Sequence, residues 1–450
     1  MGIGRAALLS VFRRVSRIYF RETEVVGDVP LPSTGGRVFG ANHVNGLVDP
    51  ILVLTNAPCA IAPLAKSTLW KVPILKWLLD AANAVPVIRR QDDPNKKSES
   101  NDAIFEKVAA HLTTGGNILI FPEGTSHNEP HLVKLKTGAG RMLTRAHDEG
   151  ARGLTFQAVG LEFDDRESFR SRALVVYGPV RSVDDLGASG DALVVAITEQ
   201  LRDDLSELIV EGSDWEDRLL IARVASLFAH DAGDESLRAW NEIGRQVEAA
   251  RKTLGANAAG HAALYAEIKS NVGLYFDALH ASDVTDEEVV RTGAAHALPS
   301  RPRKKRRAAL LALALPFAIP GAVLYWLPYQ LPRIVSRRVL APGREERDVV
   351  STYKLATGLV VFPVWAGALV SLSFVFLPPP LSLLAAGLAI VSPFAALLWL
   401  DHLEQRRLGR RRAKPTDVLH LRSMRAELSA ILARARAQIA PAPVAAAAAR

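Results

Sequence analysis

Two short polar turns hold the residues of this 450-residue chain whose types and spacing best suit chemistry. The first turn, within VFGANHVNGLVDPI, places His43 six residues before Asp49. The second, within NILIFPEGTSHNEP, carries Glu123 and His127. A histidine whose second ring nitrogen is held by a carboxylate is a general base for a hydroxyl group at neutral pH. The chain lacks a G-x-S-x-G motif, so we expect the activated hydroxyl to belong to a substrate.

Each polar turn follows a short apolar run of the kind that forms a central strand. The run at 118–121 is bounded by Pro122 and Gly124, which end a strand. In open α/β sheets, ligands bind where the strands end. Many strands also end in polar turns that only satisfy backbone groups, so position alone does not separate a site from a structural turn.

Four motifs occur along the chain in an order that resembles the glycerolipid acyltransferase superfamily, which includes the glycerol-3-phosphate and lysophosphatidic acid acyltransferases. The resemblance covers about residues 37–180. The four motifs are ANHVNGLVD with Asn42, His43 and Asp49, NAVPVIRR with Arg89 and Arg90, ILIFPEGTSH with Glu123, and FQAVGLEF.

This resemblance implies an O-acyltransferase of phospholipid biosynthesis. His43 would take the proton of an acceptor hydroxyl as it attacks the thioester of acyl-CoA or of an acyl carrier protein, and Asp49 would fix the imidazole tautomer. Neither an acyl-enzyme nor a cofactor is implied beyond acyl-CoA as co-substrate. The acceptor site would be shaped by the third motif, and fixed cations would hold a phosphate, although Arg90 and Lys136 also fit solvated surface charges. The residues implied for acceptor binding are Arg89, Arg90, Glu123, Gly124, Thr125, Ser126 and Lys136.

Two departures from the family pattern bear on the acceptor. The usual first motif has four residues between His and Asp, whereas VNGLV supplies five, so Asp49 reaches the imidazole only if the turn accommodates one more residue. The third motif continues with Ser126, where many lysophosphatidic acid acyltransferases have arginine. We therefore expect glycerol 3-phosphate or dihydroxyacetone phosphate as acceptor. A lysophosphatidic acid or other lysophospholipid acyltransferase, and a non-catalytic lipid-binding protein, remain as alternatives.

A metal site is the other chemistry that the second turn invites, because Glu123, His127 and His131 are ligand types at helical spacing. Gly124 and Pro130 disfavour a helix here, so we expect no metal. A nucleic-acid partner is not expected either. The net charge of +8 is concentrated beside apolar runs, most strongly in RPRKKRR at 301–307, which is typical of membrane flanks.

The hydrophobic pattern predicts an α/β fold, a sheet covered by helices, with a helical insertion and C-terminal membrane helices. One cysteine, Cys59, provides no disulfide framework, so a reducing compartment is expected. The predicted regions are an amphipathic membrane-surface helix at 1–24, the acyltransferase α/β domain at 25–186, an acidic helical subdomain at 187–297, a membrane region at 298–412, and a tail at 413–450 that is helical and then disordered.

The N-terminal segment predicts a helix with two distinct faces. Leu8, Phe12, Val15 and Tyr19 share one face, and arginines line the other. This pattern is typical of a helix lying flat on an anionic membrane, and an ordinary surface helix is the alternative.

Three apolar runs at 308–328, 355–377 and 381–400 are each close to the length that crosses a bilayer. Basic clusters flank the runs but not the PPP at 378–380, so the second and third runs predict a hairpin with its tip outside the cell membrane. The first run, interrupted by prolines, fits either a span or a re-entrant segment. We expect the catalytic domain on the cytoplasmic face of a bacterial membrane, in contact with membrane lipids.

Overall fold

The computed structural model describes residues 3–30, 35–71, 73–87, 99–256, 258–293, 303–339, 347–408 and 415–439. The chain folds as two compact units. The first comprises Met1–Ile209 and Leu327–Trp365, and the second comprises Val210–Trp326 and Ala366–Arg450.

The first unit is built on a seven-stranded mixed sheet with the strand order β1-β7-β6-β2-β5-β3-β4. β6 and β7 pair antiparallel, and the other neighbouring strands pair parallel. The predicted sheet covered by helices is confirmed. The strands are β1 (Glu22–Val26), β2 (Arg37–Ala41), β3 (Ile61–Lys66), β4 (Val85–Val87), β5 (Asn117–Ile120), β6 (Thr155–Phe163) and β7 (Arg172–Ser182).

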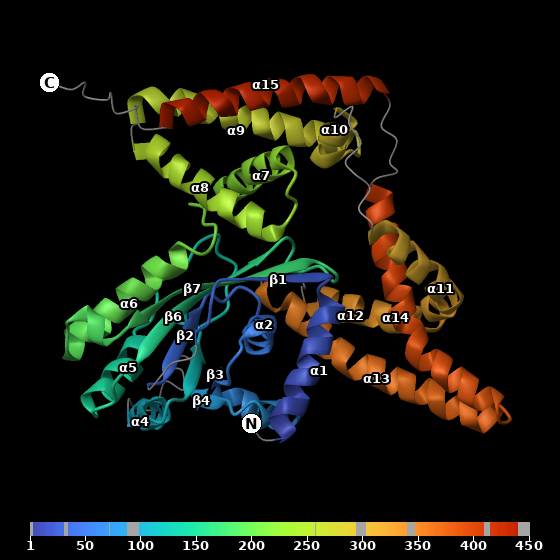
Figure 1. Cartoon of the computed structure of the whole chain (residues 1–450), viewed down its shortest axis with the longest axis horizontal. Helices are drawn as coiled ribbons and strands as arrows, with labels where there is room; N and C mark the ends of the chain where they lie inside the picture. The colour runs from blue at the N-terminus through green and yellow to red at the C-terminus, as the bar shows by residue number, and fades with distance from the viewer. Residues whose placement is uncertain are drawn as a thin grey trace. The chain divides into compact units, whose positions relative to one another are not determined.

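Helices cover both faces of this sheet (Figure 1). One face carries α4 (Glu99–Thr113), α5 (Gly138–Asp148) and α6 (Gly190–Ser206), and the other carries α1 (Ile3–Tyr19) and α2 (Val48–Asn56). The alternation of β2 explains the division, because Phe39 and Ala41 pack in the cluster of α1 and α2, whereas Gly40 faces Leu201 of α6. The short helices η1 (Ser67–Lys71), α3 (Pro73–Ala81) and η2 (Asp184–Leu186) lie in the connections.

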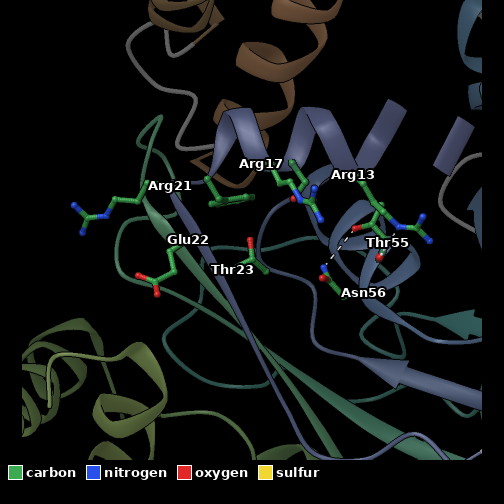
Figure 2. A pocket seen from close by; sticks show the side chains of 9 residues that line it. Arg13, Arg17, Arg21, Glu22, Thr23, Thr55 and Asn56 are labelled. Atoms are coloured by element: carbon green, nitrogen blue, oxygen red, sulfur yellow. Dashed lines mark hydrogen bonds between the residues drawn. The ribbon is translucent and has the colours of Figure 1, made fainter. Parts of the chain in front are cut away.

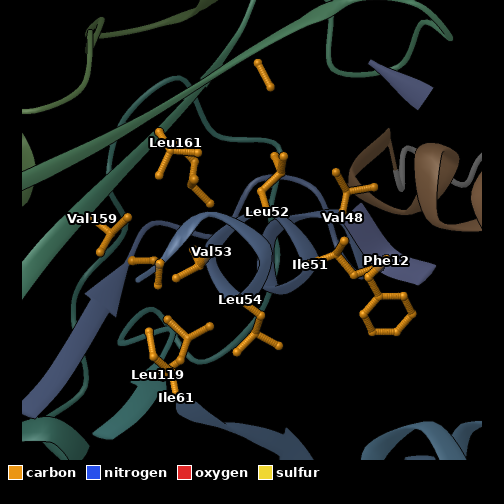
Figure 3. Packing of buried hydrophobic residues seen from close by; sticks show 14 of the residues in the cluster. Phe12, Val48, Ile51, Leu52, Val53, Leu54, Ile61, Leu119, Val159 and Leu161 are labelled. Atoms are coloured by element: carbon orange, nitrogen blue, oxygen red, sulfur yellow. The ribbon is translucent and has the colours of Figure 1, made fainter. Parts of the chain in front are cut away.

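The N-terminal helix α1 does not offer its apolar face to a membrane. Leu8, Phe12 and Tyr19 are buried in the core formed with α2 and the sheet. Figure 3 shows Phe12 beside Val48 and Ile51 of α2. The expectation that this face lies on a membrane is therefore corrected. The apolar stripe has the same periodicity whether a bilayer or a protein core covers it, and the arginine face is the exposed one.

Helix α6 packs on the sheet in the first unit, so the predicted domain boundary at 186 is corrected to Ile209. Leu201 lies against Gly40 of β2, and Arg181 of β7 forms a two-pronged ion pair with Asp204. The acidic, amphipathic sequence of α6 resembles the helices after it, and only its packing partner assigns it to the sheet.

The second unit contains a helical subdomain that includes the end of the chain. Its core joins α7 (Trp215–Ala232), α9 (Ala258–Ala281), α10 (Asp286–Gly293) and α15 (Pro415–Ile439), and α8 (Leu237–Ala256) packs on α7. The predicted helical tail is thus α15, a core helix with Leu421, Leu428 and Ile431 buried. The part of the tail predicted as disordered lies outside the described residues.

Two helices among the described residues are long and apolar enough to cross a membrane, at Arg347–Phe376 and Leu381–Leu403. They contain α13 (Val350–Phe376), preceded by the short helix η3 (Arg347–Val349), and most of α14 (Leu381–Leu408). The run predicted at 308–328 forms a bent pair, α11 (Arg303–Leu324) and α12 (Trp326–Val339), which would make a third span if the pair crosses as one. Gly321 lets α11 approach the backbone of Ser392 in α14 closely.

Candidate active site

The two polar turns lie side by side because β2 and β5 are parallel neighbours and end at the same edge of the sheet. The backbone of His43 joins them in both directions. Its N–H donates to Oε2 of Glu123 at 2.7 Å, and its carbonyl accepts from the N–H of His127 at 3.1 Å. The structure thus brings together the residues that the first and third motifs single out.

His43 and Asp49 form the predicted pair, with Nδ1 of the ring 3.0 Å from Oδ2 of the carboxylate. Asp49 is fully buried. The same Oδ2 accepts from the backbone N–H groups of Val44 at 2.9 Å and Asn45 at 2.7 Å. Three donors therefore fix the carboxylate, which in turn orients the imidazole and favours the tautomer with its proton on Nδ1.

The turn accommodates its additional residue through Gly46, whose φ of 33° is in the left-handed region. A Cβ at this position would collide with the hydroxyl of Thr352, so a side chain is excluded on steric grounds as well. Leu47 then caps α2, and Asp49 falls in the first turn of that helix, where a negative charge is favoured. The five-residue spacing consequently still delivers the carboxylate to the imidazole.

The other side of the imidazole faces Phe121, the residue directly after β5. The two rings stack with centroids 4.0 Å apart and an interplanar angle of 23°. Nε2 of His43 makes no hydrogen bond to any described residue, and the side chain is 12% exposed. A base held on one nitrogen and stacked on one face keeps the other nitrogen available for a substrate hydroxyl. Phe121 was not predicted as a site residue, although its position at the end of a buried strand was a signal.

Asn42 has a structural part in this arrangement. Its side chain donates to the carbonyl of Leu161 at 3.0 Å and accepts from the N–H of Leu161 at 2.7 Å. The amide thereby extends the pairing of β2 with β6 by one step beyond the last strand residue. This contact fixes the point at which the chain leaves the sheet just before His43.

The side chain of Glu123 is buried, and its carboxylate contacts other residues of the two turns. Its Oε2 accepts from His43, and its Oε1 lies 3.0 Å from Nε2 of His127, although the two atoms are out of line for a hydrogen bond. Nδ1 of His127 accepts from the N–H of Glu129 at 3.1 Å, so the ring proton is on Nε2 and faces the carboxylate. Glu123 thus joins the two turns, and its predicted part in shaping the acceptor site stays a prediction.

The rest of the third motif surrounds the turn. Gly124 has φ of 79°, and the side chain of Lys136 lies where a Cβ at Gly124 would be. Thr125 is exposed, and Ser126 donates to Asp348 at 2.5 Å. Lys136 is therefore next to the turn, as a phosphate ligand there would need to be. Arg89 and Arg90, the other predicted phosphate ligands, lie outside the described residues.

In the part of the chain that the structure describes, no group of three His, Cys, Asp or Glu side chains is placed to hold a metal ion. The contacts of His43 with Asp49 and Glu123 fit acid–base chemistry at the imidazole.

Comparison with known proteins agrees with this chemistry. Residues 22–161 match the family model described as Acyltransferase. Glycerol-3-phosphate O-acyltransferase 2 of Saccharomyces cerevisiae is 24% identical over 281 residues, which cover 59% of this chain and 37% of that protein. Lyso-ornithine lipid O-acyltransferase of Pseudomonas aeruginosa is 30% identical over 129 residues, which cover 29% of this chain and 44% of that protein. The chain therefore spans less than half the length of these curated relatives.

The solved structure of a 1-acyl-sn-glycerophosphate acyltransferase from Thermotoga maritima aligns with 45% of this chain and 80% of its own, with 16% identity and a TM-score of 0.32. The family match covers the five strands β1 to β5 and most of β6, together with both polar turns. The similarity to the Acyltransferase family model thus falls on the part of the chain that carries the candidate site.

Proposed function

We propose that the protein is a membrane-bound O-acyltransferase that moves an acyl group from acyl-CoA, or from an acyl carrier protein, to a hydroxyl of a glycerol-type acceptor. The observation that carries this proposal is the His43–Asp49 pair at 3.0 Å, in which Nε2 of His43 makes no hydrogen bond to the described residues. His43 takes the proton of the acceptor hydroxyl while its oxygen attacks the thioester carbonyl carbon. A C–O bond forms, the C–S bond breaks, and the thiolate of the donor receives the proton from the imidazolium.

Asp49 has an electrostatic part in this step. As His43 becomes positively charged, the carboxylate at 3.0 Å stabilises the imidazolium without itself taking the proton. Phe121 restricts the ring to the plane that Asp49 selects.

Glycerol 3-phosphate or dihydroxyacetone phosphate is the acceptor that we propose. Two of the similar proteins are glycerol-3-phosphate O-acyltransferases of yeast, and Lys136 beside Gly124 offers a cation for a phosphate dianion. A lysolipid acceptor is the second candidate, and the similarity to a lyso-ornithine lipid O-acyltransferase favours it.

One assay distinguishes the acceptors. Membranes that contain the full chain are incubated with labelled acyl-CoA and, in turn, with glycerol 3-phosphate, dihydroxyacetone phosphate, lysophosphatidic acid and lyso-ornithine lipid. We expect the highest kcat/KM with one of the two small phosphates. A higher value with a lysolipid would replace the acceptor assignment and leave the chemistry at His43 intact, whereas no transfer to any of them would contradict the proposed reaction.

We also propose that the domain lies on the cytoplasmic face of a bacterial membrane, with the tip between α13 and α14 on the opposite side. Basic residues flank these helices but are absent from the tip at Pro379. A Pro379→Cys variant, with Cys59 replaced by Ser, should react with an impermeant thiol reagent in intact cells. Reaction only after lysis would reverse this orientation.

Membrane lipids are proposed to contact the arginine face of α1. Arg13, Arg17 and Arg21 line a pocket of about 430 Å³, and Figure 2 shows Arg13 and Arg17 above Thr55 and Asn56 of α2. Arg13 donates to the carbonyl of Thr55 at 3.2 Å, which leaves much of its guanidinium for an anion. Anionic head groups are a ligand of this chemistry.

A further inference from the structure

The start of the membrane helix α13 contacts both polar turns of the candidate active site. Asp348 of η3 and Thr352 of α13 are four residues apart, so they lie on one face of the helical turn. Both belong to the same unit as the sheet, within Leu327–Trp365. The candidate span Arg347–Phe376 therefore begins at the site.

Thr352 holds the first turn. Its hydroxyl oxygen accepts from the N–H of Leu47, the residue that caps α2, at 2.9 Å. Gly46 packs so closely on the same hydroxyl that any side chain there would displace it. Thr352 thus supports the segment that carries the additional residue between His43 and Asp49.

Asp348 holds the second turn. Its Oδ2 accepts from the hydroxyl of Ser126 at 2.5 Å, and the residue is 8% exposed. A hydrogen bond from a hydroxyl to a carboxylate is short and strong, because the acceptor is charged. The rotamer of Ser126, and with it the end of the third motif, is therefore determined by a residue far away in the sequence.

The loop between β6 and β7 connects the same helix to the first turn. The carbonyl of Arg166 accepts from the hydroxyl of Ser351 and, at 3.1 Å, from the side chain of Asn45. Lys354 donates to the carbonyl of Glu167 at 2.5 Å. These contacts are independent of those of Asp348 and Thr352, so the start of α13 is fixed on the site from two sides.

We propose that Asp348 and Thr352 are positioning residues of the acyl-transfer site. The first turn of this membrane helix would then belong to that site in addition to anchoring the chain in the membrane. The inference rests on the proposed function. Asp348 sets the acceptor turn through Ser126, and Thr352 sets the base through the turn of His43 and Asp49. Losing Asp348 should therefore affect acceptor binding, and losing Thr352 should affect turnover.

The first test reads the contact directly and needs no activity. In the full chain in detergent or nanodiscs, hydrogen exchange of the peptides that include Leu47 is compared between the wild type, Thr352→Val and Thr352→Ser. We expect about tenfold faster exchange in Thr352→Val and recovery in Thr352→Ser, because serine restores the acceptor oxygen. Thr357→Val is the matched control, since Thr357 lies on the same helix and makes no side-chain hydrogen bond to the described residues. Equal exchange in all four proteins would overturn the contact.

The second test separates KM from kcat. Asp348→Ala should raise the KM for the acceptor about tenfold with little change in the KM for acyl-CoA, and Ser126→Ala should do the same. The double variant should be no worse than either single variant, because the two side chains act through one hydrogen bond. Additive losses, or equal changes in both KM values, would overturn the proposal for Asp348.

Failure of the proposed function has a different signature. If the wild type transfers acyl groups to no acceptor, the acyltransferase proposal fails, while the exchange experiment still decides whether Thr352 holds the turn. If the wild type is active and the Asp348 and Thr352 variants match it in every parameter, the positioning role fails and the acyl-transfer chemistry stands.

Discussion

Each unit of the molecule contains a buried aspartate that is hydrogen-bonded to a histidine, and the two pairs have different surroundings. In the first unit, Nδ1 of His43 lies 3.0 Å from Asp49, and in the second, Nδ1 of His230 lies 2.7 Å from Asp286. Distance alone would rank the second pair as the better catalytic dyad. The groups that share each carboxylate reverse that ranking.

Asp286 serves the helical core. Besides His230, it accepts from the hydroxyl of Tyr275 at 2.6 Å and from Nε of Arg425 at 2.9 Å. Arg425 also donates to the carbonyl of Leu227, so this one carboxylate joins α7, α9, α10 and α15. Arg425, which also pairs with Asp231, offsets part of the charge of Asp286, so less of that charge is available to stabilise an imidazolium.

Asp49 has no such cation, since among the described residues its ion-pair partner is His43. Its other donors are backbone N–H groups, which orient the carboxylate without cancelling its charge. The comparison teaches that a His–Asp distance identifies a base only together with the charges around the carboxylate. We therefore propose His43 as the base, because no cation is paired with its carboxylate partner among the described residues, and His230 as a structural member of a network.

The largest expected effect is a difference in kcat between variants of these two histidines. His43→Ala is expected to lower kcat by about 100-fold or more, because it removes a general base, with little change in stability. His230→Ala is the matched variant in the other pair. It should retain acyl transfer and lower the thermal unfolding temperature, because Asp286 loses one of its three partners.

The measurement is acyl transfer in membranes alongside thermal unfolding of the purified chain. Near-normal turnover in His43→Ala would end the assignment of the base. A large loss of activity in folded His230→Ala would show that the second pair also takes part in the reaction. That result would contradict the structural role assigned to His230.

A smaller effect is expected from acid. Burial alone would raise the pKa of Asp286, but the hydrogen bond with His230 and the charge of Arg425 outweigh it, so the pKa of this carboxyl lies below its usual value. A carboxyl whose pKa is lower in the folded chain stabilises the fold above the pH at which the unfolded chain titrates. That stability is lost as the pH falls through the folded pKa. The helical unit should therefore weaken in acid.

Asp286→Asn isolates this contribution. At about pH 7 the variant should unfold at a lower temperature than the wild type, and the gap should close as the pH falls below about 4. Asp231→Asn is the control, because Asp231 also pairs with Arg425 but its side chain is 47% exposed, so its effect should be smaller at every pH. A gap that stays constant with pH would mean that charge is not what Asp286 contributes.

The sequence predicted the central strands better than the edge of the sheet. β5 is shifted by one residue from the apolar run predicted at 118–121, and β2 directly precedes the first polar turn as predicted, because buried apolar runs bounded by turns are distinctive. β1 was missed. Its sequence ETEVV is charged and half-exposed, and its partner β7 follows about 150 residues later, so its pairing is decided by tertiary structure.

The site divides in the same way. His43, Asp49 and Glu123 were predicted because they belong to two local motifs, and the structure brings them together. Asp348 and Thr352 were not predicted, since their partners Ser126 and Leu47 are 222 and 305 residues away. Just before the membrane span predicted at 355–377, an aspartate and a threonine carry no signal of a site. Only the fold shows that they face it.

The smallest effect is expected from Lys136, a cation of the first unit that is not paired with Asp49. Lys136 lies against Gly124 and is exposed, so its charge is available to an anionic acceptor and not used in an internal network as that of Arg425 is. Lys136→Ala should raise the KM for a phosphorylated acceptor by about three- to tenfold, because a partly solvated contact between a lysine and a phosphate is modest. The KM for acyl-CoA and the value of kcat should change little.

Lys134→Ala is the matched control for this last comparison, since Lys134 is also exposed, lies two residues earlier, and forms no ion pair with the described residues. Its kinetics should equal those of the wild type. The effect of Lys136→Ala should also shrink as the salt concentration rises, because screening weakens the contact in the wild type and leaves the variant unchanged. If an uncharged acceptor showed the same rise in KM, Lys136 would act through the shape of the turn at Gly124 and not through its charge. The phosphate would then have to be held by other cations, among which Arg89 and Arg90 are the predicted ones.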